Sequence, residues 1–174
     1  MSSLRLINET EIASGVSSQL INNVFSEDFD TYKIVADGIL LSSTGGTNIN
    51  LRLVNSVGVV ITEDYVFANY NMKSGGSFTD TNRGTGKDQI DFYFGRAGAG
   101  GQCASMTGFI FNPFDSSLFT MGFYENVYNN NNINMEGTKG NFSYPFAESI
   151  TGFQAFATST MGAGTIRTYG LRRS

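Results

Sequence analysis

The chain has 174 residues, with no histidine, no tryptophan and one cysteine, and Gly, Ser, Thr and Asn make up about two fifths of it. This composition excludes Ser/His/Asp and Cys/His nucleophile systems, an ordinary zinc site and an internal disulfide. The formal net charge of −4 arises in residues 1–30, and residues 31–174 are neutral, so no basic stripe is present to follow a nucleic-acid backbone.

Apolar residues recur with a period of two along the chain, which is typical of β-strands. Ile49, Leu51 and Leu53 alternate with polar residues, and Phe92 and Phe94 follow the same rule. Clusters of Gly, Ser and Asn separate these runs and mark turns. The predicted strands are 3–8, 16–22, 31–41, 47–55, 57–62, 65–73, 89–95, 104–111, 118–125, 141–145, 150–158 and 163–171.

Short strands at regular spacing, without helical segments between them, indicate an antiparallel sandwich or barrel. We predict an all-β, antiparallel, two-sheet β-sandwich formed by one domain, residues 1–174. Two long polar loops are expected at 74–88 and 126–140. The expected interior residues are Ile34, Leu51, Leu53, Phe92, Phe94, Phe153 and Tyr169.

Phenylalanine is concentrated between residues 109 and 123. These rings exceed what one face of a strand pair must bury, so either both faces are covered within the chain or part of this surface meets another chain. The second alternative predicts a protein interface. Its candidate residues are Leu4, Leu6, Phe109, Phe111, Phe114 and Phe119.

No constellation of catalytic, cofactor-binding or metal-ligating residues is visible, and we expect a protein that is not an enzyme and needs no cofactor. Asp28 and Asp30 could contribute to a calcium site, although a solvated turn with local hydrogen bonds is the preferred interpretation. A glycan-binding loop is the alternative use of the polar residues after position 126. Its candidates are Tyr128, Asn129, Asn130, Asn131 and Asn132.

Both ends of the chain carry motifs that resemble a known class of proteins. The segment 25–35 reads FSEDFDTYKIV, 150–153 reads ITGF, and 162–171 reads GAGTIRTYGL. These motifs resemble those of small virion structural proteins of tailed phages, of the marine and cyanobacterial type. Phe29 stands where those proteins usually have tyrosine, and Thr168 where they have an apolar residue. The resemblance implies a jelly-roll-like β-sandwich on a phage particle and transfers no catalytic residues.

Two functions follow from this resemblance. The first is a capsid decoration, or cement, protein that binds the outside of the head, with the major capsid protein or other virion proteins as partners. The alternative is an adhesin at the tip of a tail or head fibre that binds a host-surface glycan. The absence of a coiled coil or fibrous repeat favours the first function, and the long polar loops favour the second.

The expected location is the virion, assembled in the host cytoplasm, because residues 1–11 lack the features of a signal peptide and no apolar run approaches the about 20 residues of a membrane span. We expect a homo-oligomer, with a trimer as the simplest match to threefold positions on a capsid. The first strand either adds to a neighbour's sheet edge or pairs within its own sheet.

Overall fold

The computed structural model describes residues 4–41, 47–76, 79–97, 102–129 and 135–171. Within these ranges the chain is all-β and antiparallel, as predicted, and contains no helix. The described part therefore has no helix of the length and apolarity that crosses a membrane. The strands are β1 (Leu4–Glu11), β2 (Val16–Ile21), β3 (Thr31–Leu41), β4 (Thr47–Asn55), β5 (Tyr65–Lys73), β6 (Thr79–Lys87), β7 (Ile90–Ala97), β8 (Ala104–Phe111), β9 (Phe119–Asn129), β10 (Met135–Ala147) and β11 (Ile150–Leu171).

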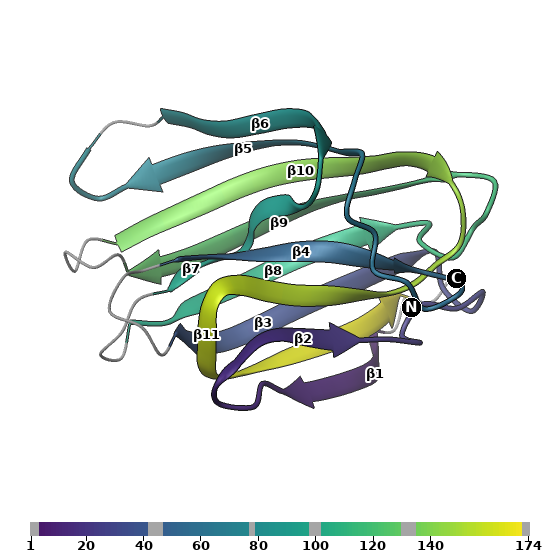
Figure 1. The fold of residues 1–174 in the computed structure, drawn as a ribbon, viewed down its shortest axis with the longest axis horizontal. Helices are drawn as coiled ribbons and strands as arrows, with labels where there is room; N and C mark the ends of the chain where they lie inside the picture. The colour runs from purple at the N-terminus through teal and green to yellow at the C-terminus, as the bar shows by residue number, and fades with distance from the viewer. Residues whose placement is uncertain (1–3, 42–46, 77–78, 98–101, 130–134, 172–174) are drawn as a thin grey trace.

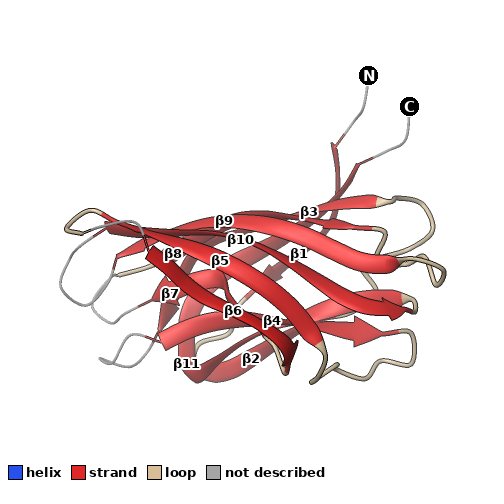
Figure 2. Cartoon of the chain, turned by 90° about the horizontal axis from the view of Figure 1, so that it is seen from above, coloured by secondary structure: helices blue, strands red, loops and turns tan. Residues whose placement is uncertain are grey.

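Hydrogen bonds join all eleven strands in one sheet that folds over on itself, rather than in two separate sheets. The long strand β11 makes the fold-over. Its first half pairs with β4 and β2, and its second half pairs with β3 and β1. Two layers result, which Figures 1 and 2 show facing each other. The wide layer runs β6-β5-β10-β9-β8-β3-β11-β1, and the narrow layer runs β2-β11-β4-β7.

The bend in β11 requires glycine. The pairing of β11 with β3 shifts register twice between Met161 and Thr165, and Gly164 lies there with a φ of 141°. A Cβ on Gly164 would lie 2.9 Å from Cα of Ile39 on β3. Because L side chains rarely adopt this conformation and the space is filled, the strand can cross from one layer to the other only with glycine here.

Aromatic rings fill the space between the layers. Phe153 on β11 stacks on Phe94 of β7 with ring centroids 6.2 Å apart, and on Phe25 at 6.0 Å. Tyr93 of β7 packs across the gap against Tyr124 of β9, at 4.7 Å, and against Phe142 of β10, at 5.7 Å. Burial of such large apolar surfaces is the main force that holds the narrow layer on the wide one.

Most of the predicted interior residues are buried: Ile34, Leu51, Leu53, Phe94 and Phe153 have at most traces of exposed surface. The side chain of Phe92 lies outside the described part. The prediction for Tyr169 is wrong, because it is only half-buried and its neighbour Thr168 is buried instead. The ring of Phe29 occupies the space over Gly170, so the inward face of β11 carries small residues at this end.

Four further predictions about strands and loops are wrong. Residues 57–62 form no strand and contribute a single bridge between Val54 and Val60. The predicted loop 74–88 contains β6, and the predicted loop 126–140 is largely occupied by the ends of β9 and β10. The two strands expected at 150–158 and 163–171 are one continuous strand.

The first strand, β1, pairs with β11 of its own chain from Leu4 to Glu11, which is the second of the two alternatives predicted for it. In the described part, β11 is its one hydrogen-bonded neighbour, so β1 forms an edge of the wide layer. The start of β1 and the end of β11 pair at Leu4 and Leu171, and this end of the two strands projects beyond the body of the molecule (Figure 2).

Candidate protein interface on the wide layer

The strand β9 has an inverted pattern of burial. Its inward residues include Thr120, Tyr124 and Asn126, whereas its outward residues include Phe119 and Phe123. In a sheet with one solvated face, the apolar residues normally point inward and the polar ones outward. The inversion places large apolar side chains on the outer face of the wide layer, where they are exposed to water in the isolated chain.

Cross-strand registers place these side chains in two rows that cross seven strands, with apolar residues gathered on β1, β11, β8 and β9. In one row, Leu6 of β1 lies beside Tyr169, and the row continues through Lys33, Phe109, Phe123 and Asn141 to Ala68 of β5. The next row runs from Leu4 through Leu171, Thr31, Phe111, Met121 and Ser143 to Val66. We call the apolar members of these rows, with Phe119, the apolar band: Leu4, Leu6, Phe109, Phe111, Phe119, Met121, Phe123, Tyr169 and Leu171.

The apolar band is substantially open to solvent. Leu6 is 50% exposed, Phe119 49% and Phe123 42%. The ring of Phe123 stacks on Phe109 with centroids 5.2 Å apart and also contacts Phe111, so these rings hold each other in fixed positions. With neighbouring strands about 4.8 Å apart, the band extends about 19 Å from β1 to β9. Lys33 and Thr31 of β3 interrupt the band between β11 and β8. A group of exposed apolar side chains of this extent is typical of an interaction site.

Charged pairs border the band along the next row of side chains. Lys139 of β10 places Nζ 2.6 Å from Oε1 of Glu125 on β9. At the other end, Nε of Arg167 donates to Oε2 of Glu9 at 2.5 Å, and this contact raises the pKa of the Arg167 guanidinium. An apolar centre with a polar rim is the usual arrangement of a protein interface.

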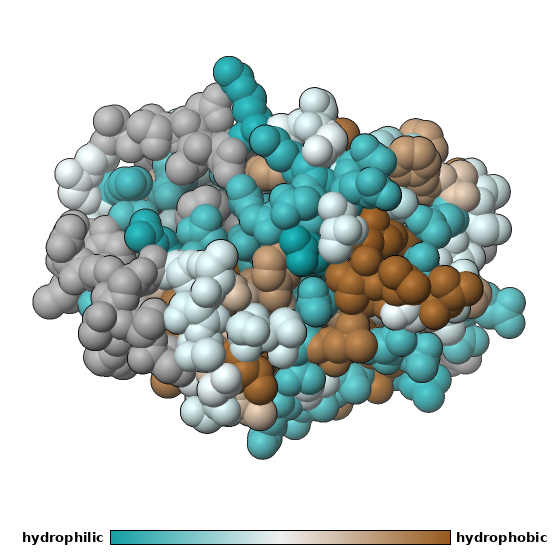
Figure 3. Space-filling view, viewed as in Figure 1, coloured by the Kyte–Doolittle hydropathy of each residue, from teal (hydrophilic) through white to brown (hydrophobic). Residues whose placement is uncertain are grey.

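The outer face of the narrow layer has a different character. Arg52 of β4 lies over the ring of Phe156, 4.2 Å from its centroid, and pairs with Asp88 at 3.1 Å. Hydrophilic residues cover much of this side of the molecule, and hydrophobic ones gather toward one end (Figure 3). Leu20 of β2 is an exposed apolar residue of this layer. This side therefore mixes an apolar patch with hydrophilic residues, whereas the wide layer carries the cluster of Phe109, Phe111 and Phe123.

Five of the six predicted interface residues meet on the wide layer: Leu4, Leu6, Phe109, Phe111 and Phe119. Phe114 does not join them. It lies in the turn between β8 and β9, half-buried, and lines a separate hollow with Ser26 and Asp30. The alternative in which the chain covers all of these rings is wrong for Phe119 and Phe123, whose side chains remain exposed.

The predicted glycan loop is wrong at Tyr128. This side chain is 2% exposed and points inward, where its hydroxyl donates to Oε2 of Glu136 at 3.1 Å and accepts from Nδ2 of Asn71 at 2.9 Å. Burial raises the pKa of the Tyr128 phenol. Asn129 is exposed at the end of β9. Asn130, Asn131 and Asn132 lie outside the described residues.

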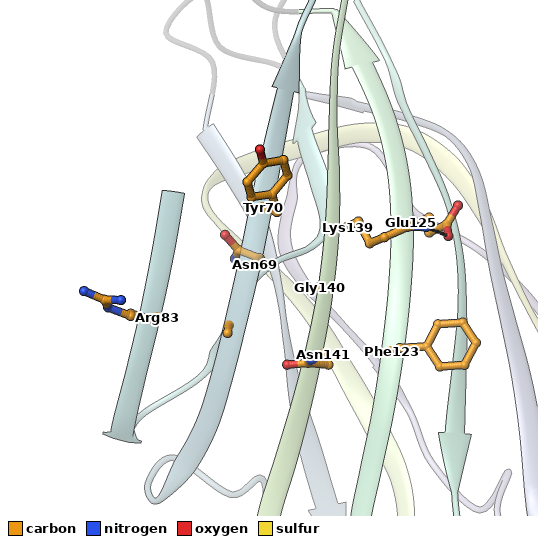
Figure 4. Close-up of a pocket in the computed structure, with 9 residues that line it drawn as sticks. Asn69, Tyr70, Arg83, Phe123, Glu125, Lys139, Gly140 and Asn141 are labelled. Carbon is orange, nitrogen blue, oxygen red and sulfur yellow. Dashed lines mark ion pairs between the residues drawn. The ribbon is translucent and has the colours of Figure 1, made fainter. Parts of the chain in front are cut away.

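Sequence reasoning missed the outward residues of β5 and β10, notably Tyr70, Lys139 and Asn141. These residues line a hollow of about 570 Å³ beside the charged row, together with Ala68, Asn69, Arg83, Phe123, Glu125 and Gly140 (Figure 4). The sequence predicts a loop at residues 126–140, and side chains of a loop do not line up on one face of a sheet. The alternation of Phe119, Met121, Phe123 and Val127 continues past residue 125 and was the available signal that the strand is longer.

No family model matches the chain, and no curated protein is similar to it in sequence. Among solved structures, the CBM2 module of the evolved Dit of Lactobacillus casei BL23 phage J-1 gives a TM-score of 0.29 at 6% identity, over 99% of this chain and 98% of that one. Infectious bursal disease virus Gx strain gives 0.17 at 10% identity, over 100% of this chain and 39% of that one. The VP2 subviral particle of infectious bursal disease virus gives 0.16 at 9%, over 98% and 41%. TM-scores this low do not establish a shared fold and identify no function for the chain.

Proposed function

We propose that this chain is a structural protein of a tailed-phage virion and decorates the outside of the capsid. The observation that carries the proposal is the inverted pattern of β9, which exposes Phe119, Met121 and Phe123 on the outer face of the wide layer. A protein partner would remove these side chains from water. Each fully buried side chain of this size contributes about 1.5–3 kcal/mol relative to its exposed state.

The terminal motifs support the choice of a virion, since they resemble those of small phage structural proteins. The difference between the outer faces supports attachment by one side, with the wide layer on the major capsid protein or another virion protein and the narrow layer facing solvent. The folded-over sheet would serve as a compact, jelly-roll-like binding module without enzymatic activity or a cofactor, assembled in the host cytoplasm. A trimer would place three copies around a local threefold position of the shell.

The proposal is tested with a matched pair of variants on opposite faces. Leu6→Ser removes an apolar side chain of the band that is 50% exposed, and Leu20→Ser removes one that is 46% exposed on the narrow layer. Each purified protein is mixed with particles assembled without this chain, and bound protein is measured by cosedimentation. We expect Leu6→Ser to weaken binding by at least about tenfold and Leu20→Ser to leave it unchanged.

Equal binding of both variants, or binding lost only with Leu20→Ser, would contradict the assignment of the wide layer as the docking face. Electron cryomicroscopy of the complete particle gives the location. Density for this chain on the tail or on a fibre, instead of on the head, would replace decoration by the second candidate function, a fibre-tip adhesin for a host-surface glycan. The specific observation that favours this second candidate is the hollow beside Tyr70.

A further inference from the structure

We propose that the hollow between β5, β10 and β9 binds an oligosaccharide. This surface is separate from the loop at 128–132 that the sequence suggested for a glycan. It shares Phe123 with the apolar band, so a sugar chain and a docked protein would compete for this end of the face. Six side chains give it its chemistry: Tyr70, Arg83, Phe123, Glu125, Lys139 and Asn141 (Figure 4).

The strand register explains why the surface is hollowed there. Tyr70, Lys139 and Glu125 form one cross-strand row. In the adjacent row, the short side chains of Ala68 and Asn141 precede Phe123. The rings of Tyr70 and Phe123 therefore stand on strands about 10 Å apart, with Lys139 and Asn141 of β10 between them (Figure 4). A sugar chain lying across β10 would pass between these two rings.

Both rings keep exposed surface, since Tyr70 is 44% exposed and Phe123 is 42% exposed. Aromatic rings present an apolar face, on which the C–H side of a pyranose can pack while its hydroxyl groups point to the side. Phe123 is additionally fixed by stacking on Phe109. A rigid ring loses little conformational entropy when a ligand binds.

Polar side chains between the rings can satisfy hydroxyl groups. Lys139 supplies N–H donors, Glu125 supplies carboxylate acceptors, and the amide of Asn141 supplies both. The ion pair between Lys139 and Glu125 places a donor and an acceptor 2.6 Å apart, on side chains that are both well exposed. Adjacent hydroxyl groups of a sugar need this combination, because each hydroxyl both donates and accepts a hydrogen bond.

Other ligand classes fit this hollow less well. It contains one carboxylate and two cationic side chains, which is too little positive charge for a nucleic-acid backbone. The apolar band gives way to Asn141 and Ala68 at this end, so the hollow lacks the continuous apolar centre of a protein interface. A neutral or weakly acidic oligosaccharide matches both the charge and the mixture of rings and polar groups.

The experiment uses the complete chain on an array of bacterial O-antigens and capsular polysaccharides, printed together with cellohexaose, xylohexaose and mannohexaose. The dissociation constant for each bound component is then measured by isothermal titration calorimetry. We expect the wild type to bind at least one component. We expect Tyr70→Ala and Asn141→Ala to weaken this binding at least tenfold, and Tyr70→Phe, which keeps the ring, to weaken it less than threefold.

Two controls separate the hollow from the rest of the face. Tyr169→Ala removes a half-buried tyrosine of the same outer face at the distant strand β11, and Leu6→Ser removes a residue of the apolar band; both should retain glycan binding. The circular dichroism spectrum and melting temperature of each variant show that it is folded. Because Leu6→Ser is the variant expected to lose particle attachment, failure of glycan binding and failure of capsid docking give different results.

The proposal is overturned if the wild type binds no component of the array, or if Tyr70→Ala binds as tightly as the wild type. In the first case, the attachment of Tyr70→Ala to particles is measured as well, and a loss of attachment would show what the hollow does instead. That result would assign the hollow to the protein interface.

Discussion

Replacement of Tyr93 by phenylalanine should stabilise this protein, although the side chain is completely buried. Tyr93 lies on β7, and its ring packs against Phe94, Tyr124 and Phe142 between the two layers. Its hydroxyl has no hydrogen-bond partner among the described residues and lies over Gly108 of β8. The Tyr93→Phe variant keeps every ring contact and removes only the oxygen.

The expected magnitude follows from the cost of an unsatisfied hydroxyl, which is about 1–3 kcal/mol when the group is buried. The void left by the oxygen offsets part of this gain. We therefore expect the free energy of unfolding to rise by about 1 kcal/mol and the melting temperature by about 2–4 °C.

Tyr65 supplies the matched comparison, because its hydroxyl accepts a hydrogen bond from the N–H of Leu53 at 2.7 Å and donates one to the carbonyl of Ile61 at 3.1 Å. Tyr65→Phe leaves both backbone groups without this partner and should lower the free energy of unfolding by about 1–3 kcal/mol.

Urea denaturation followed by circular dichroism measures both free energies under the same conditions. The same chemical change should have opposite signs at the two positions. If Tyr93→Phe destabilises the protein as much as Tyr65→Phe, the hydroxyl of Tyr93 is satisfied, and the packing inferred between β7 and the wide layer is wrong.

Three further predictions concern stability. Burial raises the pKa of Tyr65, Tyr93 and Tyr124. In the unfolded chain these phenols ionise near pH 10, whereas in the folded protein they stay protonated to higher pH. The free energy of unfolding should therefore be constant below about pH 10 and fall above it, by up to about 1.4 kcal/mol per pH unit for each phenol. Urea titrations between about pH 8 and 11 test this, and an unchanged free energy of unfolding would refute it. Leu51→Ala should cost about 2–5 kcal/mol in the same assay, since the side chain is fully buried, and a cost below about 1 kcal/mol would show that it is not core. Thr168→Val keeps the shape of a buried side chain whose hydroxyl has no partner in the described part, so it should raise the melting temperature, and a clear decrease would show that the hydroxyl is bonded.

The period of two in the sequence located most strands, because a regular strand must alternate between its faces. The same period did not show which residues face the interior where a strand is irregular. On β7 the partner register shifts between Ile49 and Leu51 of β4, and the consecutive residues Tyr93 and Phe94 are both buried. On β11, Tyr169 is more hydrophobic than its neighbours, but Thr168 and Gly170 are the buried residues, and the ring of Phe29 occupies the space over Gly170.

Strand β6 could not be predicted from side chains. Its sequence, TDTNRGTGK, has no apolar alternation, and its position in the sheet depends on backbone hydrogen bonds to β5. The apolar band was predictable only in part, because Leu4, Leu6 and Phe119 can be recognised as apolar residues of strands. Their meeting on one face depends on registers between segments more than 100 residues apart, such as Leu6 with Tyr169.

The double role of β11 has a consequence for synthesis of the chain. The strands β1, β2 and β4 all find their partner in residues 150–171, which the ribosome adds long after these strands. The strand β3 also pairs with this segment, so until then each of the first four strands has an open edge, and neither layer can be completed. Folding is therefore delayed until the last strand emerges, and ribosomes that stop before residue 150 would release chains with exposed strand edges that associate with one another.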